Sequence, residues 1–189
     1  EDFYVNTKDR KNYIFNTGIE GLEESDLIIL IGTNPRYEST ILNSRIRKAY
    51  LKNKIDIYSI GNVGDLTYPY KILEGNTKTI KNIINNKHGL SEKIVNSKKP
   101  SIIIGQSILK EKSSSYIFEE LKKYLIKNNK IDNNWNSLNV LSKNASTVGA
   151  YDLNILSSNN GKNVTFEKIK KNQYEIIFLF GQDDLKFKK

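Results

Sequence analysis

Four short loops carry the glycines and polar side chains best suited to binding a ligand. They are Gly32-Thr33-Asn34-Pro35, residues 61–65 (GNVGD), residues 105–107 (GQS) and residues 181–184 (GQDD), each directly after a short apolar run. Glycine lets a backbone turn sharply and approach a phosphate, and a helix N-terminus just beyond it favours an anion. The loops are therefore candidate anion-binding turns, although strand-to-helix turning alone also explains the glycines.

No standard phosphate-binding motif accompanies these loops. The chain has no GxGxxG after its first apolar run and no Walker A Gly-Lys-Thr/Ser, so a standard dinucleotide site and a nucleotide hydrolase are disfavoured. Adjacent carboxylates occur at residues 23–24, 119–120 and 183–184. We interpret them as solvated surface pairs, since neighbouring carboxylates on a helix point apart. Residues 68–70 (YPY) could form an aromatic stacking platform, but we favour a packed turn.

The side chains that usually bind metals or act as nucleophiles are scarce. There is no cysteine, and His88 is the only histidine. The absence of cysteine excludes disulfides, cysteine-ligated zinc, iron–sulfur clusters bound by this chain and a Cys nucleophile. One histidine in a Lys-His-Gly loop supports neither a multi-histidine metal site nor a Ser/His/Asp triad. We therefore predict no catalytic residue and no metal-binding residue.

The chain is basic, with 30 Lys+Arg against 21 Asp+Glu and a net charge of +9. Such a charge balance can indicate that a protein binds nucleic acid, anionic lipid or an acidic protein partner. The lysines are scattered singly and in pairs, however, so we predict no nucleic-acid binding. No apolar run approaches the ~20 residues that cross a bilayer, so we predict no membrane span. The acidic, polar N-terminus is not that of a signal peptide.

The elements that must position the loops alternate between strands and helices. Four apolar runs, at residues 26–31 (DLIILI), 55–60 (IDIYSI), 101–104 (SIII) and 174–180 (YEIIFLF), are rich in β-branched and aromatic residues and short enough to predict strands. Their near-continuous hydrophobicity, rather than alternation, predicts burial on both faces, as in a parallel sheet. Apolar residues at helical spacing, or shorter helical patterns, predict helices at residues 39–52, 77–84, 91–96, 113–127, 135–141 and 164–170.

This order predicts an α/β fold: a Rossmann-like, mostly parallel sheet with flanking helices, with residues 1–189 in one domain. In such sheets ligands bind beyond the carboxyl ends of the strands, where the four loops would lie. The segment at residues 152–161 is rich in Asn and Ser, and we predict that it forms a loop. The polar tail after the last run, where a helix would normally follow, suggests that the domain is incomplete, as does the absence of methionine.

An ordered set of segments resembles a known family. The segments are GLEESD (21–26), LIGTNPRYE (30–38), LNSRIRKA (42–49), VGDLTY (63–68), KKPSIIIGQS (98–107), Trp135, NVL (139–141), AS (145–146), AYDL (150–153) and FLFG (178–181). Together they resemble the large iron–sulfur subunit (the 75 kDa type and its bacterial counterpart) of respiratory complex I, NADH:ubiquinone oxidoreductase. The resemblance covers nearly the whole chain. After FLFG the family favours Ala-Asp, where this chain has Gln182-Asp183.

The resemblance implies part of a domain of the molybdopterin oxidoreductase type, without the family's N-terminal cluster-binding modules. Gly32, Thr33, Asn34 and Pro35 match a loop that lies near the cofactor in molybdopterin enzymes. In the complex I family this loop is vestigial, so the resemblance implies no cofactor in this chain, with iron–sulfur clusters elsewhere in the subunit or complex. Its role would be structural, within the peripheral arm on the matrix side of the mitochondrial inner membrane, or on the cytoplasmic face in a bacterium.

The implied partners are other complex I subunits, including a chain or segment that completes the same subunit. Arg45, Arg47 and Lys48 are candidates to face these neighbours, with simple solvent exposure as the alternative. Two other functions remain open. One is a cofactor-binding oxidoreductase domain that holds molybdopterin or a nucleotide, or the central domain of a thiamine-diphosphate enzyme, which residues 99–105 would suit. The other is a basic nucleic-acid-binding module, which requires lysines around exposed aromatic residues.

Overall fold

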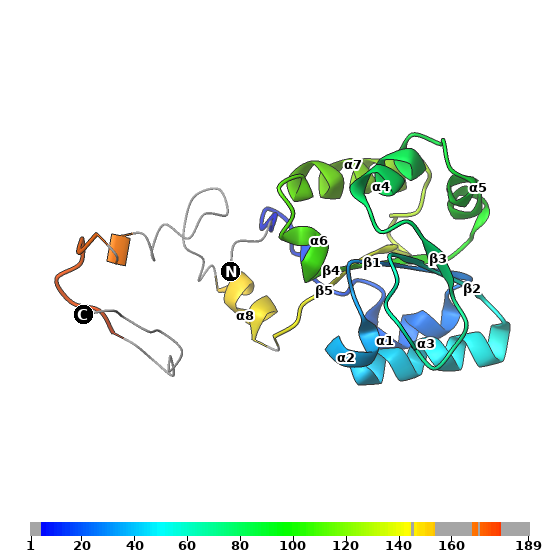
Figure 1. Ribbon diagram of the computed structural model, residues 1–189, viewed down its shortest axis with the longest axis horizontal. Coiled ribbons are helices and arrows are strands. Elements are labelled where there is room, and N and C mark those ends of the chain that lie inside the picture. The colour runs from blue at the N-terminus through cyan, green and yellow to red at the C-terminus, as the bar shows by residue number, and fades with distance from the viewer. Residues whose placement is uncertain (1–4, 145, 154–167, 170, 179–189) are drawn as a thin grey trace. The chain divides into compact units, whose positions relative to one another are not determined.

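The structure is a computed structural model that describes residues 5–144, 146–153, 168–169 and 171–178. The chain divides into two compact units, Phe3–Leu156 and a second made of Glu1–Asp2 and Ser157–Lys189. All the helices and strands named below belong to the first unit (Figure 1).

The first unit is built on a five-stranded sheet in which every neighbouring pair of strands is parallel. The order is β3-β2-β1-β4-β5. The central strand β1 pairs with β2 on one side, where Leu27 lies opposite Asp56, and with β4 on the other, where Leu27 lies opposite Pro100. The strands are β1 (Leu27–Ile31), β2 (Asp56–Ile60), β3 (Lys71–Leu73), β4 (Pro100–Gly105) and β5 (Leu138–Leu141). The predicted α/β class with a parallel sheet is confirmed.

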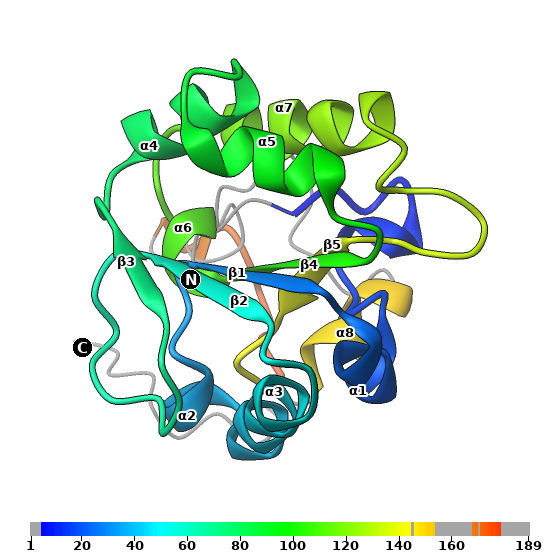
Figure 2. The same cartoon turned by 90° about the vertical axis from the view of Figure 1, so that its right-hand side faces the viewer.

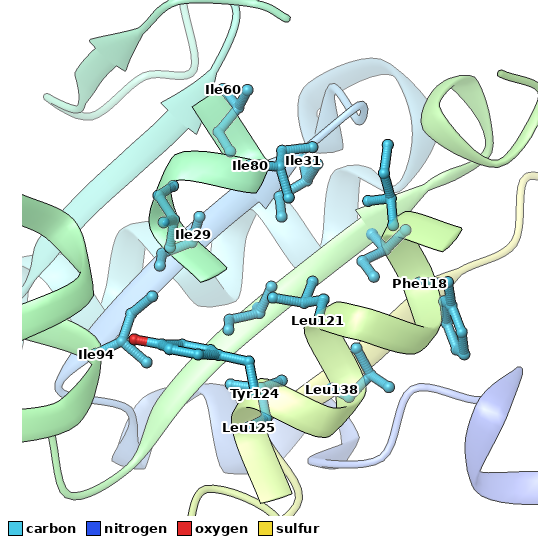
Figure 3. Packing of buried hydrophobic residues seen from close by; sticks show 14 of the residues in the cluster. Ile29, Ile31, Ile60, Ile80, Ile94, Phe118, Leu121, Tyr124, Leu125 and Leu138 are labelled. Carbon is cyan, nitrogen blue, oxygen red and sulfur yellow. The ribbon is translucent and has the colours of Figure 1, made fainter. Parts of the chain in front are cut away.

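Helices cover both faces of the sheet, which is why β1 and β4 are buried along their whole length (Figure 2). The helices α4 (Thr77–Ile84), α5 (Gly89–Asn96) and α7 (Ser114–Lys127) lie on one face, and α3 (Thr40–Asn53) lies on the other. Alternate residues of β1 supply the two cores. Ile29 and Ile31 pack in the core under α7, whereas Ile28 and Leu30 pack in the core with α3. Figure 3 shows Leu121 and Tyr124 over the first of these cores.

The longer helices follow the predicted segments closely; side chains cap the N-termini of α4 and α5, whereas α3 and α7 have no side-chain cap. The Asn76 side chain accepts the Thr79 N–H at 2.8 Å at the start of α4. Nδ1 of His88 accepts the Leu90 N–H at 3.1 Å at the start of α5. The single histidine is thus a helix cap, because a ring nitrogen can satisfy one of the amides left free at a helix start. Residues 77–84 match α4, and residues 39–52 and 113–127 match α3 and α7 to within one residue at each end.

The predicted helix at residues 135–141 is wrong. Residues Leu138–Leu141 form the edge strand β5, which pairs with Ile102–Gly105 of β4. Trp135 lies in the loop before β5, and its indole N–H donates to the Pro100 carbonyl at 2.9 Å. Four residues are too few to show a helical or strand period, so the pairing partner decides the conformation here.

The predicted strand at residues 174–180 is not found either. Residues 174–178 are in neither a strand nor a helix, and residues 179–180 lie outside the described part of the chain. An apolar run becomes a strand only where a neighbouring strand can take its backbone hydrogen bonds, and none of the described strands pairs with it. The predicted helix at residues 164–170 and the predicted loop at residues 152–161 lie mostly outside the described residues.

Candidate functional site

The first and third candidate loops meet at the carboxyl ends of β1 and β4. The strand order reverses between these two strands, which is where open α/β sheets normally bind ligands. Here the two loops are in direct contact. A β-carbon on Gly105 would lie 2.3 Å from the Gly32 carbonyl oxygen and 2.5 Å from Cβ of Thr33. The Ser107 hydroxyl donates to that same carbonyl. The crevice at the switch point is therefore closed by the protein itself.

The donors of the Gly32–Pro35 loop are occupied by a side chain of the same chain. Oε1 of Glu38 accepts the Asn34 backbone N–H at 3.1 Å, and Oε2 accepts the Thr33 hydroxyl at 2.7 Å. Glu38 is the last residue of the short helix α2 (Pro35–Glu38), which Asn34 caps by accepting the Arg36 N–H at 3.1 Å. An internal carboxylate thus bonds the donors that a phosphate would use. Sequence reasoning missed Glu38, although an acid just after an Asn-Pro helix start resembles a capping box.

The second loop is tied to the first rather than open beside it. The Asn34 side-chain amide donates to the Val63 carbonyl at 2.7 Å, and Arg36 forms an ion pair with Asp65 at 2.5 Å. The pKa of Asp65 is lowered, first by the backbone N–H of Thr67 and then by Arg36. Both Gly61 and Gly64 have positive φ, which glycine tolerates without strain. The hydrogen bond and the ion pair therefore connect the two loops directly to each other.

The segment at residues 68–70 is a packed turn, as predicted. Tyr68 is buried, and its hydroxyl donates to Oδ1 of Asn43 at 2.8 Å, while the Asn43 amide donates to the Leu66 carbonyl at 2.9 Å. Burial raises the pKa of Tyr68 far above its ordinary value. The Tyr70 hydroxyl donates to the Gly64 carbonyl at 2.8 Å. These rings therefore hold the loop in place.

A small cavity lies beyond the carboxyl ends of β4 and β5, and sequence reasoning did not find it. Its polar lining includes Gln106, which directly follows β4, and Ser142, which directly follows β5. Tyr151 of α8 (Thr147–Asp152) and Asn12 of the 3₁₀ helix η1 (Arg10–Asn12) also line it. The space open to the centre of a water molecule is about 10 Å³. Four separate parts of the chain supply these residues, so no local motif could have shown the cavity.

The fourth candidate loop, residues 181–184, lies outside the described part of the chain. The carboxylate pairs that can be described serve as surface ion pairs and hydrogen bonds. Glu23 pairs with Arg45 and with Lys48 at 2.8 Å, whereas its neighbour Glu24 pairs with Lys99. The pKa of Glu23 is lowered by hydrogen bonds from Lys48 and then Arg45. The adjacent acids thus bind different partners, as predicted for surface pairs.

Among the three cations proposed to face neighbouring subunits, two are engaged within the chain. Arg45 and Lys48 share Glu23, which joins α3 to the 3₁₀ helix η2 (Leu22–Glu24). Arg47 is exposed on α3. Of the three, Arg47 therefore remains the strongest candidate for an external contact.

A larger, open hollow lies at the opposite edge of the sheet. It has a volume of about 480 Å³. Its lining includes Asp26 and Asp56, at the amino ends of β1 and β2, and Lys93 of α5. Asp56 forms ion pairs with Lys71 at 2.9 Å and with Lys93 at 2.6 Å. Hydrogen bonds from Lys93 and then Lys71 lower the pKa of Asp56 to about 2. Both ammonium groups also lie over the Tyr58 ring, at 5.3 and 5.4 Å. The cluster joins β2, β3 and α5 through ion pairs and lies at the edge of the sheet opposite the first three candidate loops.

The described residues offer neither a metal-binding cluster nor a membrane-spanning helix. They contain no group of three or more His, Cys, Asp or Glu residues placed to hold a metal ion. None of the helices in the described ranges is both long and apolar enough to cross a membrane.

The chain is similar to a family of known proteins over nearly its whole length. A family model described as molybdopterin oxidoreductase matches residues 2–189. The chain is 41% identical to the NADH-ubiquinone oxidoreductase 75 kDa subunit of Reclinomonas americana, over 98% of this chain and 27% of that protein. It is 35% identical to the mitochondrial NADH-ubiquinone oxidoreductase 78 kDa subunit of Candida albicans, over 93% and 23%. It is 31% identical to a subunit of the NADH-quinone oxidoreductase of Rickettsia bellii, over 100% and 26%.

These similarities confirm the resemblance to the large iron–sulfur subunit of complex I. The chain spans about a quarter of the length of each of these relatives. The matched family model and the parallel sheet also agree with the predicted fold.

Proposed function

The chain belongs to the molybdopterin oxidoreductase family, and from this premise we propose that it is a structural, non-catalytic segment of the peripheral arm of respiratory complex I. Its partners are then the other subunits of that complex and the remainder of the large iron–sulfur subunit, whose known forms are about four times as long. It lies on the matrix side of the mitochondrial inner membrane, or on the cytoplasmic face in a bacterium.

The observation that carries the proposal is the bonding of Glu38 at the family's cofactor loop. A pyrophosphate-bearing cofactor needs free backbone and hydroxyl donors at its loop. At Gly32–Pro35 the Glu38 carboxylate takes the Asn34 N–H and the Thr33 hydroxyl. A cofactor phosphate would compete with a carboxylate that is covalently part of the same loop. The residues of this loop therefore do not fit a molybdopterin pyrophosphate in the described conformation.

The space at the carboxyl edge gives independent support. Small-molecule and cofactor pockets typically have volumes of roughly 300–1,000 Å³. The cavity beyond the ends of β4 and β5 has about 10 Å³, and the switch point between β1 and β4 is closed by the contact of Gly105 with Gly32. An active oxidoreductase domain that holds molybdopterin or a nucleotide would need both places to open.

The proposal is tested by isolating the native assembly that contains this chain. An affinity tag on the chain, mild detergent extraction and native electrophoresis should yield a large particle that reduces an electron acceptor with NADH. Mass spectrometry of that particle should identify the other subunits of complex I. Migration of the chain by itself, or without those subunits, would contradict the proposal.

A second measurement on the same particle addresses the alternative of a cofactor-binding enzyme. Small molecules released by denaturing the purified chain are analysed for pterins and nucleotides. We expect neither in stoichiometric amount with this chain. A pterin or nucleotide at one copy per chain would replace the structural role by an enzymatic one.

A further inference from the structure

The outer side of α3 carries two large apolar side chains that are mostly exposed. Ile41 is 68% exposed and Leu51 is 57% exposed. The buried apolar residues of the helix, Leu42, Ile46 and Ala49, lie on its other side and pack against the sheet. The ribbon views show α3 in the outer layer of the first unit on this face (Figure 1, Figure 2). The helix therefore presents apolar side chains to solvent as well as to the core.

Ile41 and Leu51 belong to one stripe along the helix. Four exposed residues follow one another at three- and four-residue spacing, which places them on one side of α3: Ile41, Ser44, Lys48 and Leu51. Ser44 is small, and its hydroxyl already bonds the Thr40 carbonyl at 3.1 Å, so it leaves room between the two apolar ends. Single exposed apolar residues are ordinary on a protein surface, whereas contiguous ones mark an interaction surface.

The stripe is surrounded by positive charge. The helix has no acidic residue and four cationic ones, namely Arg45, Arg47, Lys48 and Lys52. Arg45 and Lys48 share Glu23. Arg47 and Lys52 form no ion pair within the described part of the chain, and helical spacing places them on opposite flanks of the stripe. Each flank thus carries a cation that the described residues do not neutralise.

These features decide which kind of partner fits. A second copy of the chain would place the cations of one helix against those of the other, which costs free energy. A lipid surface binds a helix whose main apolar face is free, but the main apolar face of α3 packs on the sheet. Single-stranded nucleic acid stacks on aromatic side chains, and the stripe contains none. An acidic protein surface with an apolar centre complements both the cations and the apolar side chains.

We propose that the outer side of α3 is a docking surface for an acidic protein surface with an apolar centre, in another part of the respiratory assembly. Ile41 and Leu51 are buried on docking, and Arg47 and Lys52 pair with carboxylates at the rim, which fixes the orientation. This docking surface rests on the proposed function, which supplies the assembly, and adds the face by which the chain joins it.

The apolar part of the contact is tested in the native particle that contains the chain. Ile41→Ser combined with Leu51→Ser should lower the fraction of tagged chain in the particle about tenfold, because buried apolar anchors dominate an interface. Tyr116→Ser combined with Ile126→Ser on α7 is the matched control. It also removes two exposed apolar side chains and should leave that fraction unchanged. Because all four positions are exposed, urea denaturation should show that both double variants fold normally.

The charged part of the contact is tested by reversing the two unpaired cations. Arg47→Glu combined with Lys52→Glu should lower the same fraction several-fold at low salt. The difference should shrink at high salt, because salt screens the attraction. Lys78→Glu combined with Lys81→Glu on α4 is the control, since both lysines are exposed and without an ion pair among the described residues. An equal loss in the two double variants would make net charge alone responsible and would overturn the proposal.

Photo-cross-linking in the purified particle identifies the partner. A photo-reactive phenylalanine analogue in place of Leu51 should cross-link to a peptide rich in Asp and Glu in another part of the assembly. No cross-link, or one to lipid, nucleic acid, a second copy or a basic peptide, would overturn the proposal. If the unmodified chain enters no particle, the proposed function fails and the docking surface fails with it. If the particle forms and the α3 variants enter it normally, only the docking surface fails.

Discussion

Gly105 and Gly32 are in contact across the switch point of the sheet, so close that a β-carbon on Gly105 would lie 2.3 Å from the Gly32 carbonyl oxygen. The contact joins the end of the central strand β1 to the end of its neighbour β4. It removes the crevice that many α/β proteins use for a ligand. Four predictions test this contact, the bonds of Glu38, the ion pairs of Asp56 and the buried Ser137 hydroxyl.

Gly105→Ala should destabilise the fold strongly. The new methyl group would overlap the Gly32 carbonyl and Cβ of Thr33, and both belong to a loop held by other bonds. Overpacking of this kind costs about 1–3 kcal/mol, and backbone overlap puts this site at the upper end. Urea denaturation measures the loss. Gly149→Ala in α8, where a β-carbon meets nothing within 4 Å, is the control and should be neutral or slightly stabilising.

Glu38→Ala should destabilise the Gly32–Pro35 loop by about 2 kcal/mol, since hydrogen bonds to a charged group contribute roughly 1.5–3 kcal/mol. The Asn34 N–H and the Thr33 hydroxyl would both lose their acceptor. Glu38→Gln keeps one acceptor oxygen and should cost less. Hydrogen exchange of the Asn34 amide reports the loop directly and should accelerate. Glu120→Gln, which breaks only an exposed pair with Lys123, is the control; an equal loss there would argue against a special role for Glu38.

Asp56→Asn should make the protein less stable at neutral pH and equally stable in strong acid. The folded pKa of Asp56 is about 2, below its ordinary value of 3.8. A lowered carboxyl pKa adds stability that is present above about pH 4 and is lost as the pH falls through about 2. Because the cluster is partly exposed, we expect about 1 kcal/mol.

The measurement is the difference in unfolding free energy between wild type and Asp56→Asn across that pH range. Glu111→Gln, whose side chain bonds none of the described residues, should show no such pH-dependent difference. A constant difference for Asp56→Asn from neutral pH down to acid would contradict the ion pairs that Lys71 and Lys93 form with Asp56.

Ser137→Ala should leave the protein equally stable or stabilise it by about 1 kcal/mol. The Ser137 hydroxyl is fully buried and has no hydrogen-bond partner within the described part of the chain, although the Ser137 carbonyl accepts from Ile102. Removing a buried unpaired hydroxyl removes a desolvation cost of roughly 1–3 kcal/mol, offset by a small void. Thermal unfolding measures the change. The matched change Ser101→Ala, which breaks the buried 2.7 Å bond to Ser25, should instead destabilise.

The central strands of the sheet could be predicted from the sequence, whereas its two edge strands could not. Strands β1, β2 and β4 are mostly apolar and almost entirely buried, because helices cover both faces of the sheet. Strand β3 has three residues that are largely exposed, and β5 includes the buried polar Asn139, so neither has a pattern that distinguishes it locally. Their conformation is set by the neighbouring strand, which only the folded chain supplies.

The candidate site shows the same division. The positions of Gly32–Pro35 and of Gly105 at the ends of strands follow from apolar runs that end in glycine. The closure of the crevice does not, because it depends on Ser107 and Gly105 contacting Gly32 and Thr33 at the end of another strand. The Glu38 carboxylate, by contrast, bonds Thr33 and Asn34 of its own loop. Side chains that are distant in the sequence and each ordinary by themselves leave no local signal.

The parallel order of the strands also has a consequence for biosynthesis. The central run Leu27–Ile31 finds its first neighbour in Asp56–Ile60, but its second neighbour begins only at Pro100. Closing such a long loop lowers the chain entropy before the stabilising strand contacts have formed. Sheets of this kind therefore fold slowly. During translation, one edge of the hydrophobic strand β1 has no partner strand until β4 has been synthesised. This protein should therefore depend on chaperones while it is being synthesised.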